Sequence, residues 1–549
     1  MKKQNQALAL MTACILTACA LTGCGSSDNR YYTSTQKGDT AQENYINAPE
    51  MQDNAAEMEA EGGRDLHYSA DMEWYEEPNA EEYNAVTEAG FKNVLQNPLS
   101  TFSIDVDTAS YSNIRRMLFN GEPVNPDAVR IEEMINYFSY DYPEPADDVP
   151  FSVNTEMYDC PWNEETQLFL VGLQAEKIDL SERKPMNLVF LIDVSGSMYS
   201  EDKLPLVQEA FAMLAENLNE NDRISIVTYA GAEQVVLAGE SGSNYPRIAE
   251  SLYNLTAGGA TAGAAGIVQA YELAEEYFIE GGNNRVVLAT DGDLNVGLST
   301  EEELTALIEE ERETGVNLSV LGFGTGNLKD DRLEALADHG NGNYAYIDSL
   351  MEARKVLVQE MGGTLYTVAK DVKIQTEFNP EFVEGYRLIG YENRALANED
   401  FADDKVDAGE IGAGHSVTAL YELVLTDKAA LAVNDMELKY QETDGTTPAE
   451  TELMTISLRY KEPEGTESRL VEYPIPAEGS AGREMPDNLA FAAAVAEFGM
   501  LLRNSEYAGS SSYAQITELL EQTDMHDEYR QEFAELARLA LDTERAWYE

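Results

Sequence analysis

One apolar segment, Met-Asn-Leu-Val-Phe-Leu-Ile at 186–192, constrains the fold of this 549-residue chain more than any other feature. A run without polar alternation is typical of a strand that is buried on both faces of a parallel sheet. Strand and helix patterns alternate after it. Strands are expected at 223–229, 234–237, 285–289, 317–323 and 344–347, and helices at 204–218, 264–278, 301–314, 331–338 and 351–361. This alternation predicts a doubly wound, mainly parallel sheet.

The chain on either side of this block has the period-two pattern of antiparallel strands. Strands are expected before it at 151–158 and 167–174, and after it at 368–378, 385–391, 416–425, 454–460 and 469–473. Because the two ends of a domain are often close together, we expect these strands to form one β-sandwich into which the parallel sheet is inserted. Helices are expected on the N-terminal side at 108–119 and 125–138, and at the C-terminus at 488–503, 513–521 and 527–541. The expected fold class is therefore α/β plus β.

Oxygen-bearing side chains stand where three of the expected loops leave the parallel sheet. Asp193, Ser195 and Ser197 follow the first buried strand. Thr261 lies in a glycine-rich segment before a helix, and Asp291 follows a later strand. In an open α/β sheet the carboxyl ends of the strands meet at one edge, where ligands bind. Carboxylate and hydroxyl oxygens suit a hard cation such as Mg²⁺, so these five residues predict a metal site.

Each motif also has a simpler explanation when it is taken alone. Asp-x-Ser-x-Ser is a helix N-cap pattern as well. The glycine-rich segment is also typical of a helix entry or a weak phosphate cradle, although it lacks the Gly-Lys-Ser/Thr ending of a P-loop. All three motifs in this order, at the ends of apolar strands, favour the metal site. Asp293, an additional acid beside Asp291, either tunes the site from outside the ligand set or is a solvated side chain, and we expect the latter.

Residues 186–362 resemble a von Willebrand factor type A (VWA) domain, through DVSGSM at 193–198, AGGATAG at 257–263 and ATDGD at 289–293. The resemblance implies a metal-ion-dependent adhesion site at the top of the sheet, which holds Mg²⁺ or Mn²⁺. The residues that match the site of that family are Asp193, Ser195, Ser197, Thr261 and Asp291. The flanking segments FSIDVDTASYSNIRRML at 102–118 and FAAAVAEFGMLLR at 491–503 are similar to segments of bacterial VWA lipoproteins.

The N-terminus has the pattern of a bacterial export signal. Lys2 and Lys3 precede an apolar stretch at 7–21, and Leu21-Thr-Gly-Cys24 resembles a lipobox, in which the cysteine is lipidated. An ordinary signal peptide or a membrane anchor helix is the alternative, but the apolar stretch is shorter than the about 20 residues that a spanning helix needs. We therefore expect a lipoprotein signal peptide at 1–24, lipidation of Cys24, and an extracytoplasmic location on the cell membrane.

The chain carries 36 Lys and Arg against 101 Asp and Glu, which gives a formal net charge of −65. This balance excludes proteins that bind nucleic acid through its phosphate backbone, and it argues against electrostatic docking to anionic lipid. Residues 25–95 are acidic and show little apolar periodicity, so a disordered tether is expected there. With only four His and no His-Glu-x-x-His spacing, a histidine zinc site or a histidine-dependent triad is not expected.

Two features outside the metal motifs are expected to be structural. Asp105 and Asp107 begin a segment spaced like a calcium loop, but the glycine and the glutamate of an EF-hand loop are missing. We therefore expect Asp107 or Thr108 to cap the next helix. Cys160 is the one cysteine that lies after the lipobox, which excludes an intramolecular disulfide in the mature protein, and we expect it to be a small core residue.

We expect a surface-anchored lipoprotein that binds a protein partner through this metal site, with an acidic side chain of the partner completing the metal shell. The alternative is an envelope assembly or scaffolding factor whose sandwich and helical regions do the binding. An enzyme is not expected, because Asp293 is the only obvious local candidate for a general base. The expected segments are the signal peptide at 1–24, a tether at 25–95, N-terminal helices and strands at 96–185, the VWA domain at 186–365, the sandwich at 366–480 and a helical region at 481–549.

Overall fold

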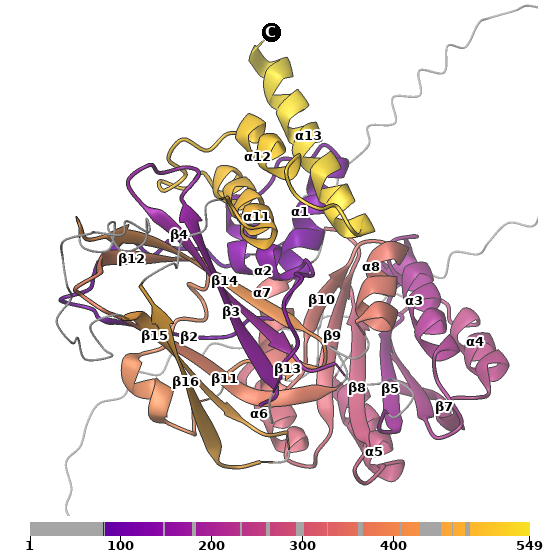
Figure 1. Ribbon diagram of the computed structural model, residues 1–549. Coiled ribbons are helices and arrows are strands. Elements are labelled where there is room, and N and C mark those ends of the chain that lie inside the picture. Colours follow the sequence, from indigo (N-terminus) through magenta and orange to yellow (C-terminus); the bar gives the residue numbers. More distant parts are fainter. Residues whose placement is uncertain are drawn as a thin grey trace, which may run out of the picture. The chain divides into compact units, whose positions relative to one another are not determined.

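Figure 1 shows the computed structural model of the chain, in which three β-sheets are accompanied by helices. The structure describes residues 81, 83–146, 149–177, 183–230, 233–259, 264–292, 301–326, 328–360, 366–406, 408–427, 452–463, 465–477 and 484–548. The predicted signal peptide with Cys24, most of the predicted tether, Thr261 and Asp293 lie outside these residues.

A six-stranded sheet lies in the middle of the chain, in the order β10-β9-β8-β5-β6-β7. Its neighbouring strands are parallel except for β7, which pairs antiparallel with β6. β5 is buried along its whole length, as its apolar sequence predicts. The bounds are β5 (Met186–Asp193), β6 (Arg223–Tyr229), β7 (Glu233–Ser241), β8 (Asn283–Thr290), β9 (Asn317–Phe323) and β10 (Tyr344–Ile347).

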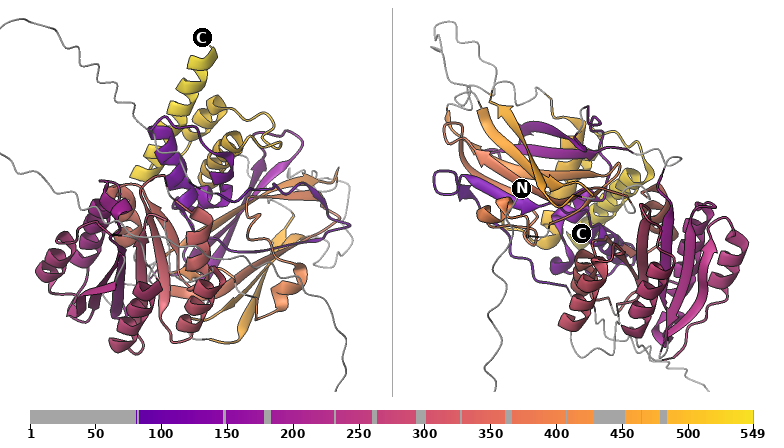
Figure 2. Two further views of the ribbon diagram at one scale, coloured as in Figure 1. Left: turned by 180° about the vertical axis from the view of Figure 1, so that it is seen from behind. Right: turned by 90° about the horizontal axis from the view of Figure 1, so that it is seen from below.

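Helices cover both faces of this sheet (Figure 2). On one face Phe190 of β5 stacks on Phe211 of α3, with the ring centroids 4.2 Å apart. On the other face Val189 and Leu191 share a core with Tyr271 of α5. This is the doubly wound, mainly parallel sheet that the sequence predicts. The bounds are α3 (Leu204–Glu216), α4 (Tyr245–Tyr253), α5 (Ala264–Glu276), α6 (Glu301–Arg312), α7 (Asp330–His339), α8 (Leu350–Arg354) and the π-helix η3 (Lys355–Gln359).

Helix α4 is the one described α-helix of this block that the sequence pattern did not predict. Its buried residues include Ile248 and Leu252, which are spaced by four and therefore lie on one face. That face packs in the same core as α3. The apolar residues of α4 recur at helical spacing, so the sequence did carry the signal for this short helix and the prediction missed it.

Two further sheets are antiparallel. The first has the order β1-β12-β14-β4-β3, and the second has the order β13-β11-β15-β16 with β2 also paired to β11. The bounds of the first are β1 (Lys92–Asn93), β3 (Phe151–Asp159), β4 (Gln167–Ala175), β12 (Val383–Ile389) and β14 (Ser416–Leu425). Those of the second are β2 (Leu99–Ser103), β11 (Thr367–Phe378), β13 (Ile411–Gly412), β15 (Glu452–Lys461) and β16 (Ser468–Pro476).

Strands from before and after the six-stranded sheet lie side by side in the first antiparallel sheet. β4 pairs with β14 from Gln174 opposite Ser416 to Gln167 opposite Leu423. The two antiparallel sheets share one hydrophobic core. In that core Phe378 of the second sheet stacks on Tyr386 of the first, with the centroids 4.2 Å apart.

Helices from the two ends of the described chain share another core. Figure 1 shows α11, α12 and α13 in yellow beside α1 and α2 in purple. Phe138 meets Phe491 and Phe533, with ring centroids 5.0 and 5.4 Å apart. The helix expected at 125–138 is a 3-10 turn followed by a shorter helix, because Val129 and Arg130 are extended. The bounds are α1 (Ala109–Phe119), η1 (Pro126–Ala128), α2 (Ile131–Asn136), α11 (Asp487–Arg503), α12 (Tyr513–Leu520) and α13 (Glu528–Tyr548).

The last part of the expected tether makes contacts with the folded chain. β1 pairs with β12, and Val94 beside it is buried. Glu81 forms an ion pair with Arg116 at 3.0 Å. Described structure therefore begins before residue 96. A few apolar and charged side chains attach this segment to the folded chain, although its composition is otherwise that of a tether.

The expectation that Asp107 or Thr108 caps α1 is wrong. Thr108 stands at the N-cap position, but its side chain accepts no capping hydrogen bond. Asp107 Oδ1 instead accepts a hydrogen bond from the backbone of Tyr344 at 3.0 Å, and its Oδ2 accepts one from Arg394 at 2.9 Å. Cys160 is a buried core residue, as predicted, and burial raises the pKa of its thiol to about 12. Among the described residues, no helix combines the length and the apolarity needed to cross a bilayer.

Candidate functional site

The candidate site lies where two neighbouring parallel strands end. Asp193 is the last residue of β5 and Thr290 is the last residue of β8, and the register pairs Ile192 with Ala289 just before them. Asp193 and the following Asp291 are both buried. The two carboxylates therefore reach the same edge of the sheet, as the sequence predicts.

The loop after β5 turns its polar groups toward one another. The backbone N–H of Ser195 donates a hydrogen bond to Asp193 Oδ1 at 2.8 Å, and the hydroxyl oxygens of Ser195 and Ser197 lie 2.9 Å apart. Ser195 has an extended backbone, and a 3-10 helix, η2 (Gly196–Tyr199), begins after it. Ser195 stands at the N-cap of η2 but makes no capping hydrogen bond, so helix capping does not explain this motif.

The glycine-rich loop is attached to this first loop through its backbone. Gly258 donates to the carbonyl of Val194 at 2.7 Å, and Gly196 donates to the carbonyl of Gly259 at 3.1 Å. Gly259 has a φ of +100°, and a Cβ there would lie 3.0 Å from the carbonyl oxygen of Ala230, so the turn requires glycine. The chain that leads to Thr261 is thus held beside Ser195, although Thr261 itself lies outside the described residues.

A lysine that the motif spacing does not point to belongs to this site. Lys203 Nζ donates a hydrogen bond to Asp291 Oδ2 at 2.9 Å, and both residues are buried. The aliphatic part of the Lys203 side chain packs against Gly324, which follows β9. A Cβ added to Gly324 would lie only 2.3 Å from Lys203 Cε, so the two are in close contact. The position of Lys203 just before α3 carries no motif, so only the fold brings it to Asp291.

Burial shapes the electrostatics of the first carboxylate. Removal from water raises the pKa of Asp193 to about 6, and the negative charge of Asp291 acts in the same direction. The hydrogen bonds from Ser195 act in the opposite direction and favour the ionised form. A cation bound at this edge would therefore neutralise carboxylates that folding has already removed from water.

The donor set consists of carboxylate and hydroxyl oxygens. Among the described residues no group of three or more His, Cys, Asp or Glu is placed to hold a metal ion, so a metal here depends on the serine hydroxyls. Two buried carboxylates with two adjacent hydroxyls fit the preference of Mg²⁺ or Mn²⁺ for oxygen ligands. The structure brings Asp193, Ser195 and Ser197 together, and it places Asp291 on the adjacent strand end.

Family models match three parts of the chain. The model of the von Willebrand factor type A domain matches residues 187–360, and a von Willebrand factor model matches residues 77–170. A model described as the C-terminal part of the uncharacterized protein YfbK matches residues 363–542.

Relatives cover most of the chain. The uncharacterized protein YfbK of Escherichia coli (strain K12) is 43% identical over 472 residues, which are 84% of this chain and 81% of that protein. The uncharacterized protein sll0103 of Synechocystis sp. is 24% identical over 314 residues, 56% of this chain and 69% of that protein. A solved von Willebrand factor type A structure from Catenulispora acidiphila is similar over 73% of this chain and 91% of that chain, at 15% identity and a TM-score of 0.42. The chain therefore belongs to the family of YfbK, and its residues 187–360 form a VWA domain.

Proposed function

We propose that this protein is a lipid-anchored surface protein that binds a protein partner through a Mg²⁺ or Mn²⁺ ion held by Asp193, Ser195, Ser197, Thr261 and Asp291. The observation that carries the proposal is the convergence of Asp193, Ser195 and Ser197 beside the strand end that bears Asp291. The VWA domain supports a role in protein interaction or adhesion.

Each residue of the site has a separate role in this proposal. Asp193 and Asp291 supply negative charge, and the hydroxyls of Ser195, Ser197 and Thr261 supply neutral oxygens. With few anionic ligands from the chain, a bound divalent ion attracts a further carboxylate, which the partner offers through an Asp or Glu side chain. The hydrogen bond from the Ser195 backbone orients the Asp193 carboxylate at 2.8 Å.

An exposed aromatic ring beside the site supports a protein partner. Tyr199 ends η2, two residues after Ser197, and 83% of its surface is exposed. Exposed aromatic side chains are enriched where proteins bind one another, because they bury a large area with little loss of side-chain entropy. A hollow of about 390 Å³, whose lining includes Val194 and Thr256, lies next to the same loops and gives room for the residues around the partner's acid.

The test is capture of partners on intact cells by crosslinking, with and without Mg²⁺. We expect EDTA and Asp193→Ala each to abolish capture while the thermal unfolding transition is retained. Glu201→Ala, which removes an exposed acid from the same loop region, is the matched control and should capture normally. Undiminished capture after EDTA or Asp193→Ala would contradict the metal-bridged mechanism.

The lipid anchor rests on the sequence alone, because Cys24 lies outside the described residues. We expect Cys24→Ser to move the protein from the membrane fraction to the soluble fraction of the cell envelope. Mass spectrometry of the mature N-terminus should find a diacylglyceryl-modified Cys24 in the wild type. An unmodified Cys24 at the mature N-terminus, or a protein cleaved elsewhere, would contradict the anchor.

A second candidate function is envelope assembly or scaffolding through the antiparallel sheets and the terminal helices. It is favoured by one observation, the buried ion pair between Lys203 and Asp291, which gives one of the proposed metal ligands a counterion from the chain itself. Capture of the same partners by the full chain carrying Asp193→Ala, in EDTA, would support this candidate. In neither candidate is the protein proposed to be an enzyme.

A further inference from the structure

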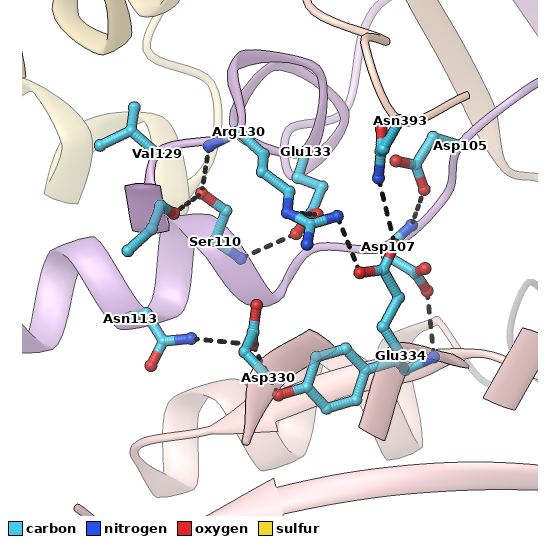
Figure 3. A network of polar contacts seen from close by, with 12 residues as sticks. Asp105, Asp107, Ser110, Asn113, Val129, Arg130, Glu133, Asp330, Glu334 and Asn393 are labelled. Carbon is cyan, nitrogen blue, oxygen red and sulfur yellow. Dashed lines mark hydrogen bonds and ion pairs between the residues drawn. The ribbon is translucent and has the colours of Figure 1, made fainter. Parts of the chain in front are cut away.

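A cavity of about 450 Å³ lies far from the metal motifs in sequence, where four separate parts of the chain meet. It is lined by residues 84–87, by Arg130 and Glu132 at the start of α2, by α7 of the VWA domain, and by residues 392–394 after β12. Figure 3 shows the polar network that includes Arg130, Glu334 and Asn393, all of which line the cavity.

Carboxylates outnumber guanidinium groups in the cavity wall. The acids are Glu132, Glu334, Asp338 and Glu392, and the bases are Arg130 and Arg394.

The guanidinium groups are already engaged. Arg130 pairs with Glu334 at 2.7 Å and with Glu133 at 3.4 Å. Arg394 pairs with Glu334 at 3.0 Å and with Asp338 at 2.9 Å. It also pairs with two acids that do not line the cavity, Asp105 at 3.3 Å and Asp107 at 2.9 Å. The network as a whole therefore retains an excess of negative charge.

Some of these carboxylate oxygens have no hydrogen-bond partner among the described residues. Glu132 is 1% exposed, and its Oε2 accepts no hydrogen bond. The same holds for Oε2 of Glu392, which also lines the cavity, and for Oδ2 of Asp105. A buried carboxylate oxygen without a donor is costly, so such atoms in a native protein indicate a missing partner.

The buried carboxylates of the cavity wall hold protons more tightly than exposed ones. Burial, with the charges of nearby carboxylates, raises the pKa of Glu132 to about 7 and the pKa of Glu334 to about 8. Arg503 pairs with Glu392 at 3.2 Å and also lowers the pKa of Glu132, but it counters only part of the charge. A cationic ligand would replace the protons and donate hydrogen bonds to the orphaned oxygens.

We propose that this cavity binds a small organic cation with ammonium groups, of the diamine or polyamine class. Its volume suits a small organic ligand and is far larger than a bare ion needs. Among the described residues, no three acidic, histidine or cysteine side chains are gathered closely enough to chelate a metal. An ammonium group supplies up to three donors, which matches the unpartnered oxygens of Glu132 and Glu392.

The experiment is calorimetric titration of the full chain with putrescine and spermidine at physiological salt. Because a chain of net charge −65 attracts any amine weakly, the expected result is a saturable component of one site per chain above a non-saturating background. Glu132→Gln should weaken that component at least about tenfold, since a charge-assisted hydrogen bond is lost. 1,4-Butanediol, which has the same spacing without charge, should not bind.

Glu384→Gln is the matched control. Glu384 is exposed on β12 and does not line the cavity, so this substitution removes the same charge at a distance from the proposed site. It should leave the saturable component unchanged. If Glu132→Gln fails to fold, Glu392→Gln serves in its place. The proposal is overturned if the wild type shows no saturable amine site, or if Glu384→Gln loses the site as fully as the cavity variant does. It is also overturned if Ca²⁺ saturates the site and the amines do not.

Discussion

Lys203 Nζ donates a hydrogen bond to Asp291 Oδ2 over 2.9 Å, in a place where both side chains are shielded from solvent. Asp291 belongs to the predicted metal ligands, so the protein carries its own ammonium ion at the site. A buried carboxylate needs such a counterion when no metal is bound. A divalent ion bound at the proposed site would therefore compete with Lys203 for the charge of Asp291.

Lys203→Met is the variant that separates these two partners of Asp291. Without the ammonium group, Asp291 loses a buried counterion, so the free energy of unfolding in EDTA should fall by about 3 kcal/mol. Affinity for Mg²⁺ should rise by about tenfold, and saturating Mg²⁺ should restore much of the lost stability. Denaturant unfolding with and without Mg²⁺ measures both effects. Lys177→Met removes an exposed lysine and is the control; equal behaviour of the two variants would rule out competition at Asp291.

Arg115 joins three parts of the chain that are distant in sequence. From α1 it forms ion pairs with Asp348, with Glu352 of α8 at 2.8 Å and with Glu532 of α13 at 3.1 Å. Arg115→Met leaves the buried Glu352 and two partly buried acids without their shared cation, so the free energy of unfolding should fall by at least about 3 kcal/mol.

The control for Arg115 is Arg354, whose ion pair with Glu528 joins the same helices α8 and α13 at the surface. Arg354→Met should change the free energy of unfolding by less than about 1 kcal/mol, because solvent screens an exposed pair. Urea unfolding followed by circular dichroism measures both variants. A loss of similar size in both would show that burial of Arg115 does not decide its contribution.

The parts of the fold that follow from local pattern were predictable. The apolar run of β5 identifies the central strand, and the placement of Asp193 and Asp291 follows because parallel strands end at one edge. Period and strand-end position are properties of neighbouring residues, so a single sequence is sufficient to find them.

Contacts between distant segments were not predictable. Asp107 looks like a helix cap in the sequence, but its partners are Tyr344 and Arg394, more than two hundred residues away. Lys203 likewise meets Asp291 only after α3 and β8 are in place. A charged side chain carries no local sign of its partner, so ion pairs and the excess of acids near Glu132 become visible only in three dimensions.

The pairing of β4 with β14 leads to a prediction about the segment after the VWA domain. Residues 367–476 expressed alone should be unfolded or aggregate, because β14 loses β4 and exposes buried residues such as Leu420 and Tyr421. Circular dichroism on heating and the dispersion of amide signals in nuclear magnetic resonance measure this. A cooperative transition of the isolated segment would contradict the insertion of the VWA domain into one sandwich.

Glu497 provides a test of the terminal helical core. It lies on α11 with no exposed surface, and neither of its carboxylate oxygens makes a hydrogen bond of normal geometry among the described residues. The Ser511 hydroxyl favours the ionised form, but burial outweighs it and raises the pKa of Glu497 from 4.5 to about 8. The folded chain therefore keeps a proton that the unfolded chain releases above about pH 4.5. The stability that this group contributes is complete below that pH and is lost as the pH rises through about 8.

Glu497→Gln keeps the shape of the side chain and cannot titrate. Between about pH 4.5 and 8, the free energy of unfolding of the wild type should fall relative to this variant by up to about 1.4 kcal/mol per pH unit. Urea unfolding of both proteins at half-unit pH steps measures this difference. The control is Glu518→Gln, which alters an exposed acid on α12; its difference from the wild type in the free energy of unfolding should not change with pH. Parallel stability profiles of the wild type and Glu497→Gln would mean that water or a donor from another part of the chain stabilises the ionised carboxylate, because a dry, unpartnered carboxylate cannot lose its proton without cost.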